Sequence, residues 1–139
     1  IHDFDRARAS QAEAEKLFLR ETGRLLAQPI DVLAHPFRFL YHAELKRPPH
    51  LHRTIARWLA QSGVATEINF HWNEPDPLFV EMCLAEGVKL ALATDAHKLE
   101  EVGDLSRHLR LLKQLGVRDE DLPDVLYSPG ESANQRVSE

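Results

Sequence analysis

The feature that most constrains the fold is an alternation of short apolar runs with longer stretches of helical periodicity. Apolar runs of strand length cover residues 30–34, 64–69 and 88–93, and helical patterns cover 5–26, 51–61, 78–86 and 104–115. Strands that alternate with helices pair in parallel through right-handed crossovers, and the helices bury the sheet. The sequence therefore predicts an α/β fold with parallel strands and crossover helices.

Glycine and proline mark where the predicted elements end. Pro29 follows the first helical pattern, and Gly63, Gly87 and Gly116 follow the other three. No low-complexity linker interrupts the alternation, and a polar segment punctuated by Pro129 and Gly130 follows it. We therefore expect one domain over residues 1–127 and a polar tail over residues 128–139.

Composition excludes several classes of protein. Seventeen Lys and Arg residues against 22 Asp and Glu residues give a formal net charge of −5, which argues against extended binding to a nucleic-acid backbone. No apolar run approaches the roughly 18 residues that a membrane span needs. The single cysteine, Cys83, cannot form an internal disulfide and fits a reducing compartment, so we expect a cytoplasmic protein. The chain begins with Ile1 rather than Met, which suggests processing or a fragment.

Polar, titratable residues follow each predicted strand. They are His35 and Arg38 after the first strand, Glu67, Asn69 and His71 at the second, and Asp95, His97 and Lys98 after the third. Parallel α/β folds place ligands and catalytic groups just beyond the carboxyl ends of their strands. The sequence therefore predicts a functional site at this edge of the sheet.

Three of these residues are suitable metal ligands. Asp95 and His97 are two positions apart, so they project to the same face of an extended segment, and His35 comes from another strand end. Mixed nitrogen and oxygen donors suit Zn, Mn or Fe and leave a coordination position for water. The alternative is that Thr94 or Asp95 caps a helix and His97 lies at the surface.

The same blocks carry a family resemblance. Residues 31–38, 67–69 and 87–97 resemble, in order and spacing, the later half of the PHP family, the polymerase and histidinol phosphatase metal-dependent hydrolases. The resemblance implies a distorted, seven-stranded, TIM-like β/α barrel that holds two or three divalent metal ions and hydrolyses phosphate esters. It also implies that His35, Asp95 and His97 are metal ligands, and that His2 stands where the family has another ligand histidine.

The resemblance covers only the later half of that domain. The family's opening His-x-His block and its next His and Glu ligands have no counterpart here. We therefore expect this chain to be catalytically incomplete, with either a missing N-terminal half or self-association, and to show little or no phosphatase activity alone.

Other residues have less specific expected roles. We expect Arg38, Lys98 and His71 to contact substrate, and Glu67 and Asn69 to orient the metal ligands. His42, His50 and His52 are expected at the surface, whereas His108, Met82 and Cys83 are expected to be structural.

Three functions remain open at this point. The first is a metal-dependent phosphoesterase acting on a small phosphorylated substrate, in which Asp95 and His97 help a Zn, Mn, Fe or Mg ion present hydroxide to phosphorus. The second is a non-catalytic metal-binding or assembly half-domain that docks with another chain. The third is an amidohydrolase-type barrel that cleaves C–N bonds, but the Thr-Asp-Ala-His block after a Gly-Val strand favours the phosphoesterase.

Overall fold

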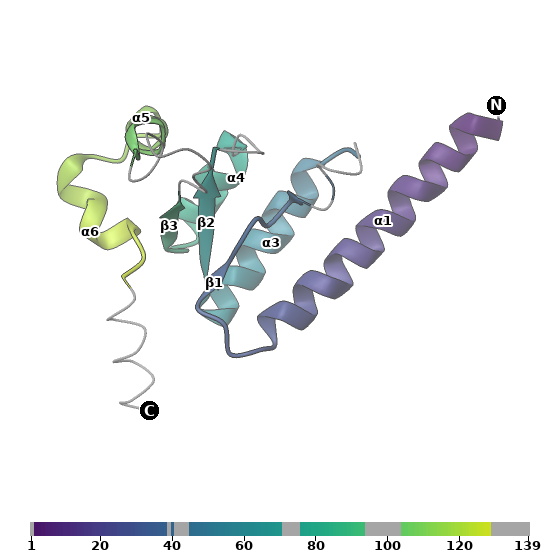
Figure 1. Ribbon diagram of the computed structural model, residues 1–139, viewed down its shortest axis with the longest axis horizontal. Coiled ribbons are helices and arrows are strands. Elements are labelled where there is room, and N and C mark those ends of the chain that lie inside the picture. The colour runs from purple at the N-terminus through teal and green to yellow at the C-terminus, as the bar shows by residue number, and fades with distance from the viewer. Residues whose placement is uncertain (1, 39, 41–44, 71–75, 94–103, 129–139) are drawn as a thin grey trace.

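The computed structural model describes residues 2–38, 40, 45–70, 76–93 and 104–128. The elements, in chain order, are α1 (His2–Leu26), β1 (Val32–Leu33), α3 (Pro49–Ser62), β2 (Ala65–Asn69), α4 (Pro77–Ala85), β3 (Leu90–Ala93), α5 (Ser106–Gln114), the 3₁₀ helix η2 (Asp119–Asp121) and α6 (Leu122–Val125). Strands and helices alternate as the sequence predicts (Figure 1). None of the described helices combines the length and the apolar character needed to cross a membrane.

The three strands form one parallel sheet in the order β1-β2-β3, which confirms the predicted α/β class. Leu33 is paired with Thr66, and Thr66 is paired with Leu90. Beyond α6 the chain returns to β3, where Leu126 bridges Leu90 in parallel and the N–H of Tyr127 donates to the Leu90 carbonyl at 2.8 Å. Each successive strand is therefore added on the same side of the preceding one.

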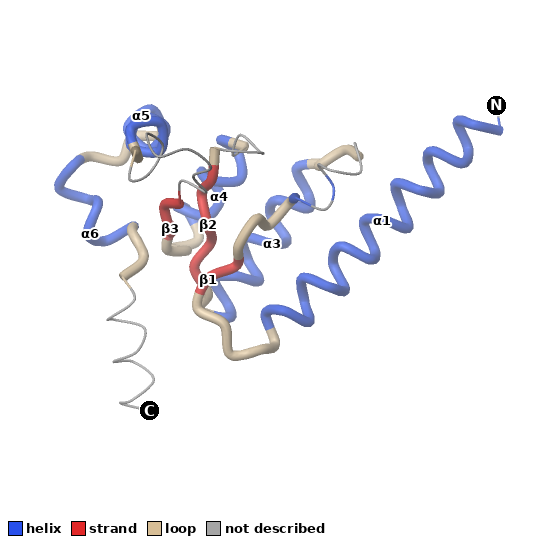
Figure 2. The backbone as a smooth tube through the Cα atoms, in the orientation of Figure 1, coloured by secondary structure: helices blue, strands red, loops and turns tan. Residues whose placement is uncertain are grey.

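The crossover helices α3 and α4 lie side by side (Figure 2). α3 connects β1 to β2, and α4 connects β2 to β3. Because right-handed crossovers between successive neighbours place their helices on the same face, both helices cover one side of the sheet. Alternation along β2 then places Thr66 and Ile68 on one face and Glu67 and Asn69 on the other.

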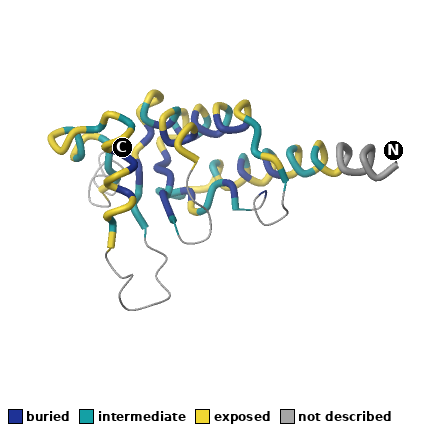
Figure 3. The backbone as a smooth tube through the Cα atoms, turned by 90° about the horizontal axis from the view of Figure 1, so that it is seen from above, coloured by how far each residue is buried: buried dark blue, intermediate teal, exposed yellow. Residues whose placement is uncertain are grey.

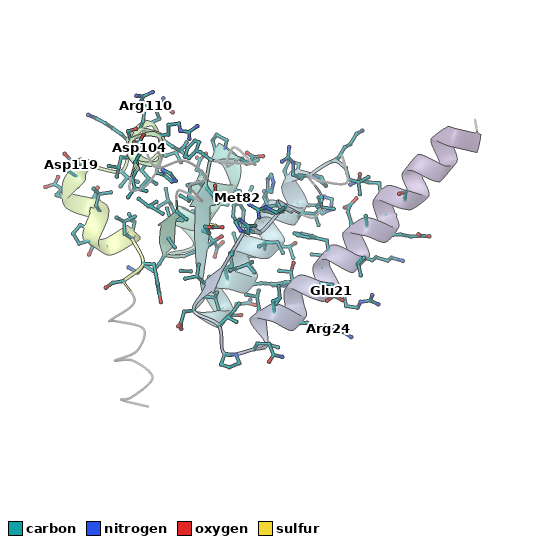
Figure 4. The ribbon with its side chains drawn as sticks, viewed as in Figure 1. Glu21, Arg24, Met82, Asp104, Arg110 and Asp119 are labelled. Carbon is teal, nitrogen blue, oxygen red and sulfur yellow. The ribbon has the colours of Figure 1, made fainter. Side chains whose placement is uncertain are left out.

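The core lies between the sheet and the helices, and Figure 3 shows the buried segments gathered in the middle of the molecule. Its fully buried side chains include Leu40, Leu51, Ile55, Leu59, Ile68, Leu90 and Leu112. Charged residues lie outside it, as Figure 4 shows for Glu21 and Arg24 on α1. Gly63 ends α3 at φ +67°, a left-handed conformation that glycine adopts without a Cβ clash.

Cys83 and Met82 belong to this core, as expected. Cys83 is fully buried on α4, and Met82 packs against the core from the same helix. Burial, with a smaller contribution from the Glu86 carboxylate, raises the pKa of the Cys83 thiol to about 12. The nucleophilic form of a thiol is the thiolate, so burial disfavours the reactive form of Cys83.

Candidate functional site

A pocket lies at the carboxyl ends of β1 and β2, where the sequence places the functional site. It is lined by the turn after β1, the end of β2 and the beginning of α4. Four of the predicted site residues meet there, namely His35, Arg38, Glu67 and Asn69. Arg47, His52 and Asp76 also line it.

The best-defined contact in the pocket joins His35 to Glu67, which is 32 residues further along the chain. Glu67 Oε2 accepts a hydrogen bond from the backbone N–H of His35 at 2.8 Å. The same oxygen lies 2.8 Å from His35 Nδ1. The Glu67 side chain is 12% exposed and that of His35 is 28% exposed, so the pair is partly shielded from water.

His35 is held in an unusual backbone conformation. Its φ is +48°, and among the described residues no other non-glycine residue has a positive φ. This conformation costs free energy for a residue with a Cβ, and Pro36 restricts His35 further. The backbone hydrogen bond to Glu67 opposes this cost, and the 2.8 Å contact between Glu67 Oε2 and Nδ1 orients the imidazole ring. Strain of this kind concentrates at binding and catalytic sites.

The Glu67 contact also determines which nitrogen of His35 is available. A carboxylate accepts hydrogen bonds and donates none, so the proton of a neutral His35 ring resides on Nδ1. Nε2 then carries the free lone pair. Histidines that ligate metals commonly donate their other ring N–H to a carboxylate in this manner.

The end of β3 is anchored by His108. This histidine is buried on α5, and its Nε2 lies 2.8 Å from the carbonyl oxygen of Ala93, the last residue of β3. Its ring also packs edge-on against Phe70 with centroids 4.8 Å apart. The structural role expected for His108 therefore agrees with its burial, and it holds the strand that leads into Thr94 and Asp95.

Several predicted site residues lie outside the part of the chain that the structure describes. They are His71, Asp95, His97 and Lys98. His2 opens α1, but its side chain is likewise not described. α1 has 25 residues and spans about 37 Å, and its beginning lies well to the side of the sheet (Figure 1). Within the part of the chain that the structure describes, no group of three His, Cys, Asp or Glu side chains could hold a metal ion.

The expectation that His52 lies at the surface is wrong. Its side chain is 1% exposed, and its ring packs edge-on against Phe37 with centroids 4.7 Å apart. His52 Nε2 lies 3.6 Å from Asp76 Oδ2. Burial lowers the pKa of His52, Asp76 raises it, and Arg47 lowers it further. His50, by contrast, is exposed as expected and pairs with Glu15 at 3.2 Å.

The sequence carries a signal that would have placed His52 inside. It stands three and seven positions before Ile55 and Leu59, so it continues the apolar stripe of α3 by one turn. The polarity of histidine and its place near the start of the helix hid this pattern.

Comparisons with protein-family models, with curated proteins and with solved structures found no match for the chain.

Proposed function

We propose that this chain is the later part of a PHP-like, metal-dependent phosphoesterase with a seven-stranded β/α barrel. The observation that carries the proposal is the Glu67–His35 pair, which fixes the ring of His35 and leaves Nε2 as a donor at a strand end. The expected ligand set is His35 with Asp95, His97 and His2. Their nitrogen and oxygen donors suit Zn, Mn, Fe or Mg.

The topology supports a barrel over an open, doubly wound sheet. In a barrel each new strand is added on the same side of the last, whereas a doubly wound sheet reverses its strand order. Here β1, β2 and β3 are added in one direction, and the chain at Leu126 continues that direction beside β3. Glu67 and Asn69 then stand on the face that would line the barrel interior.

A bound divalent cation would supply Lewis acidity and lower the pKa of a water molecule for attack on phosphorus. The described residues have supporting roles in this scheme. Glu67 holds the proton on His35 Nδ1 and orients the ring. Arg38 lines the same pocket and presents a guanidinium, whose forked donors match phosphate oxygens. Asn69, 8% exposed at the end of β2, is suited to orient a neighbouring ligand.

The four proposed ligands are too few for a cluster of two or three metal ions. We therefore expect the 139-residue chain to bind metal with moderate affinity and to hydrolyse phosphomonoesters at close to the background rate. The missing donors would come from the earlier half of a barrel.

Substituting Glu67 with glutamine tests the role of the Glu67–His35 pair. Loss of the charged acceptor weakens the hold on His35 Nδ1, so the affinity for Zn²⁺, measured by titration calorimetry, is expected to fall by about 10-fold to 100-fold. Glu15→Gln is the matched control because Glu15 also pairs with a histidine, His50, but away from the pocket. Equal affinities for wild type and Glu67→Gln would contradict the proposal.

The alternative function, an assembly half-domain, also has an observation in its favour. An apolar groove between α1 and β1 is lined by Leu17, Leu25 and Leu33, of which Leu17 is 36% exposed and Leu25 is 49% exposed. Large apolar side chains in an open groove are suited to cover by another chain. On this alternative, sedimentation velocity would show concentration-dependent association that Leu25→Asp abolishes, and Glu67→Gln would leave the association unchanged.

A further inference from the structure

Four aromatic rings from four parts of the chain pack into one ring cluster. Phe18 comes from α1, Phe37 from the turn after β1, His52 from α3 and Phe79 from α4. Phe37 stacks on Phe18 with ring centroids 5.2 Å apart, and it meets His52 and Phe79 edge-on at 4.7 Å and 4.9 Å. The centroids of His52 and Phe79 lie 5.8 Å apart. The ring cluster therefore joins three helices to the turn that contains His35.

His52 is the ring in this cluster that can take up a proton. Its side chain is 1% exposed, and neither ring nitrogen has a hydrogen-bond partner among the described residues. The neutral imidazole therefore packs as an apolar ring and continues the stripe of Ile55 and Leu59 on α3. An imidazolium in the same place would lose its hydration and have both N–H groups unpaired, which is costly in free energy.

The charged groups around His52 do not remove this cost. Asp76 Oδ2 lies 3.6 Å from His52 Nε2, too far for a hydrogen bond, and Asp76 Oδ1 caps α4 by accepting the N–H of Leu78 at 2.9 Å. Burial is the largest influence and lowers the pKa of His52, Asp76 raises it, and Arg47, from the segment before α3, lowers it further. The other charged or titratable residues that line the same pocket are His35, Arg38 and Glu67.

We propose that His52 is a pH-sensitive switch: the neutral ring holds the turn after β1 against α3 and α4, and protonation of the ring loosens this junction. The imidazolium regains its solvation only where Phe37 or Phe79 moves aside and admits water, or where Asp76 shifts toward Nε2. Each of these movements opens the ring cluster beside the pocket. The proposal involves no metal ion, so it stands or falls independently of the proposed phosphoesterase.

The direction of the pH dependence follows from the unfolded and folded states. In the unfolded chain His52 takes up a proton at its ordinary pKa of about 6.5, whereas burial lowers this pKa in the folded chain. The stability that the neutral ring provides is therefore present above about pH 6.5, and it is lost as the pH falls from there toward the lower pKa of the folded chain. If His52 stays neutral in the folded chain at about pH 5, the folding equilibrium constant falls by about 30-fold, which is the largest effect possible.

The test compares urea unfolding of wild type and His52→Leu at about pH 7.5 and about pH 5. Leucine continues the apolar stripe of α3 but takes up no proton. Between these pH values the folding equilibrium constant of wild type is expected to fall about 10-fold more than that of His52→Leu. His50→Leu is the matched control, because His50 is an exposed histidine of the same helix that pairs with Glu15, and this variant should keep the wild-type pH dependence. Equal pH dependence of wild type and His52→Leu would overturn the inference.

NMR of the wild-type chain tests the switch without any substitution. As the pH falls, the ring signals of Phe37 and Phe79 are expected to change together with the titration of His52, at a pH below the ordinary pKa of histidine. Protection of backbone amides against hydrogen exchange should fall more at the beginning of α4 than in β3, because the junction opens locally. A titration of His52 that leaves the Phe37 and Phe79 signals unchanged would contradict the switch, and so would an equal loss of protection in α4 and β3.

Discussion

Replacing His35 with alanine is expected to lower the affinity of the chain for Zn²⁺ by about 100-fold or more. The substitution removes Nε2, which the contact between Nδ1 and the Glu67 carboxylate leaves available to bind a metal ion. The loss should exceed that of Glu67→Gln, because that variant keeps the imidazole and only loosens its orientation. The measurement is calorimetric titration, or competition with a chelator of known affinity.

The control for this experiment is His50→Ala. His50 also pairs with a glutamate, Glu15, at 3.2 Å, but its side chain is 68% exposed and does not line the pocket. A general effect of removing a histidine–glutamate pair would appear in both variants, whereas a metal site at His35 predicts a loss in only one. Similar Zn²⁺ affinities for wild type and His35→Ala would refute His35 as a ligand.

The order of elements could be predicted because each depends on local sequence. A few neighbouring residues are enough to recognise an apolar run of strand length, the apolar stripe of a helix or the glycine after α3. The bounds were less accurate. The run at 30–34 predicts a strand of five residues, but β1 covers only Val32–Leu33 because the chain turns at His35, where φ is +48°. In that turn the His35 N–H donates to Glu67, 32 residues further along the chain, and no local pattern reveals this contact.

The sequence predicts which residues of the candidate site lie near one another, but not the contacts that they make. The carboxyl ends of parallel strands identify His35, Glu67 and Asn69 as neighbours, yet the spacing of residues in sequence does not say that one Glu67 oxygen accepts the backbone N–H of His35 and lies 2.8 Å from its Nδ1. His52 was missed because its polarity outweighed its place in the apolar stripe of α3. A histidine that continues such a stripe is expected to be buried.

The arrangement of α3 between α1 and α4 makes Ile55 a position where truncation of the side chain should cost much stability. Ile55 is fully buried at the middle of α3, which packs against both neighbouring helices. Ile55→Ala removes apolar contacts and leaves a cavity, so the free energy of unfolding, measured by urea denaturation, is expected to fall by about 3 kcal/mol.

Leu109→Ala is the matched control, because Leu109 is 42% exposed on α5 and its truncation should cost less than about 1 kcal/mol. Equal losses in the two variants would mean that α3 does not organise the core. Ile55 does not line the pocket. Where Ile55→Ala remains folded, its Zn²⁺ affinity should therefore match wild type, because the substitution weakens the packing of the helices and leaves the lining of the pocket unchanged.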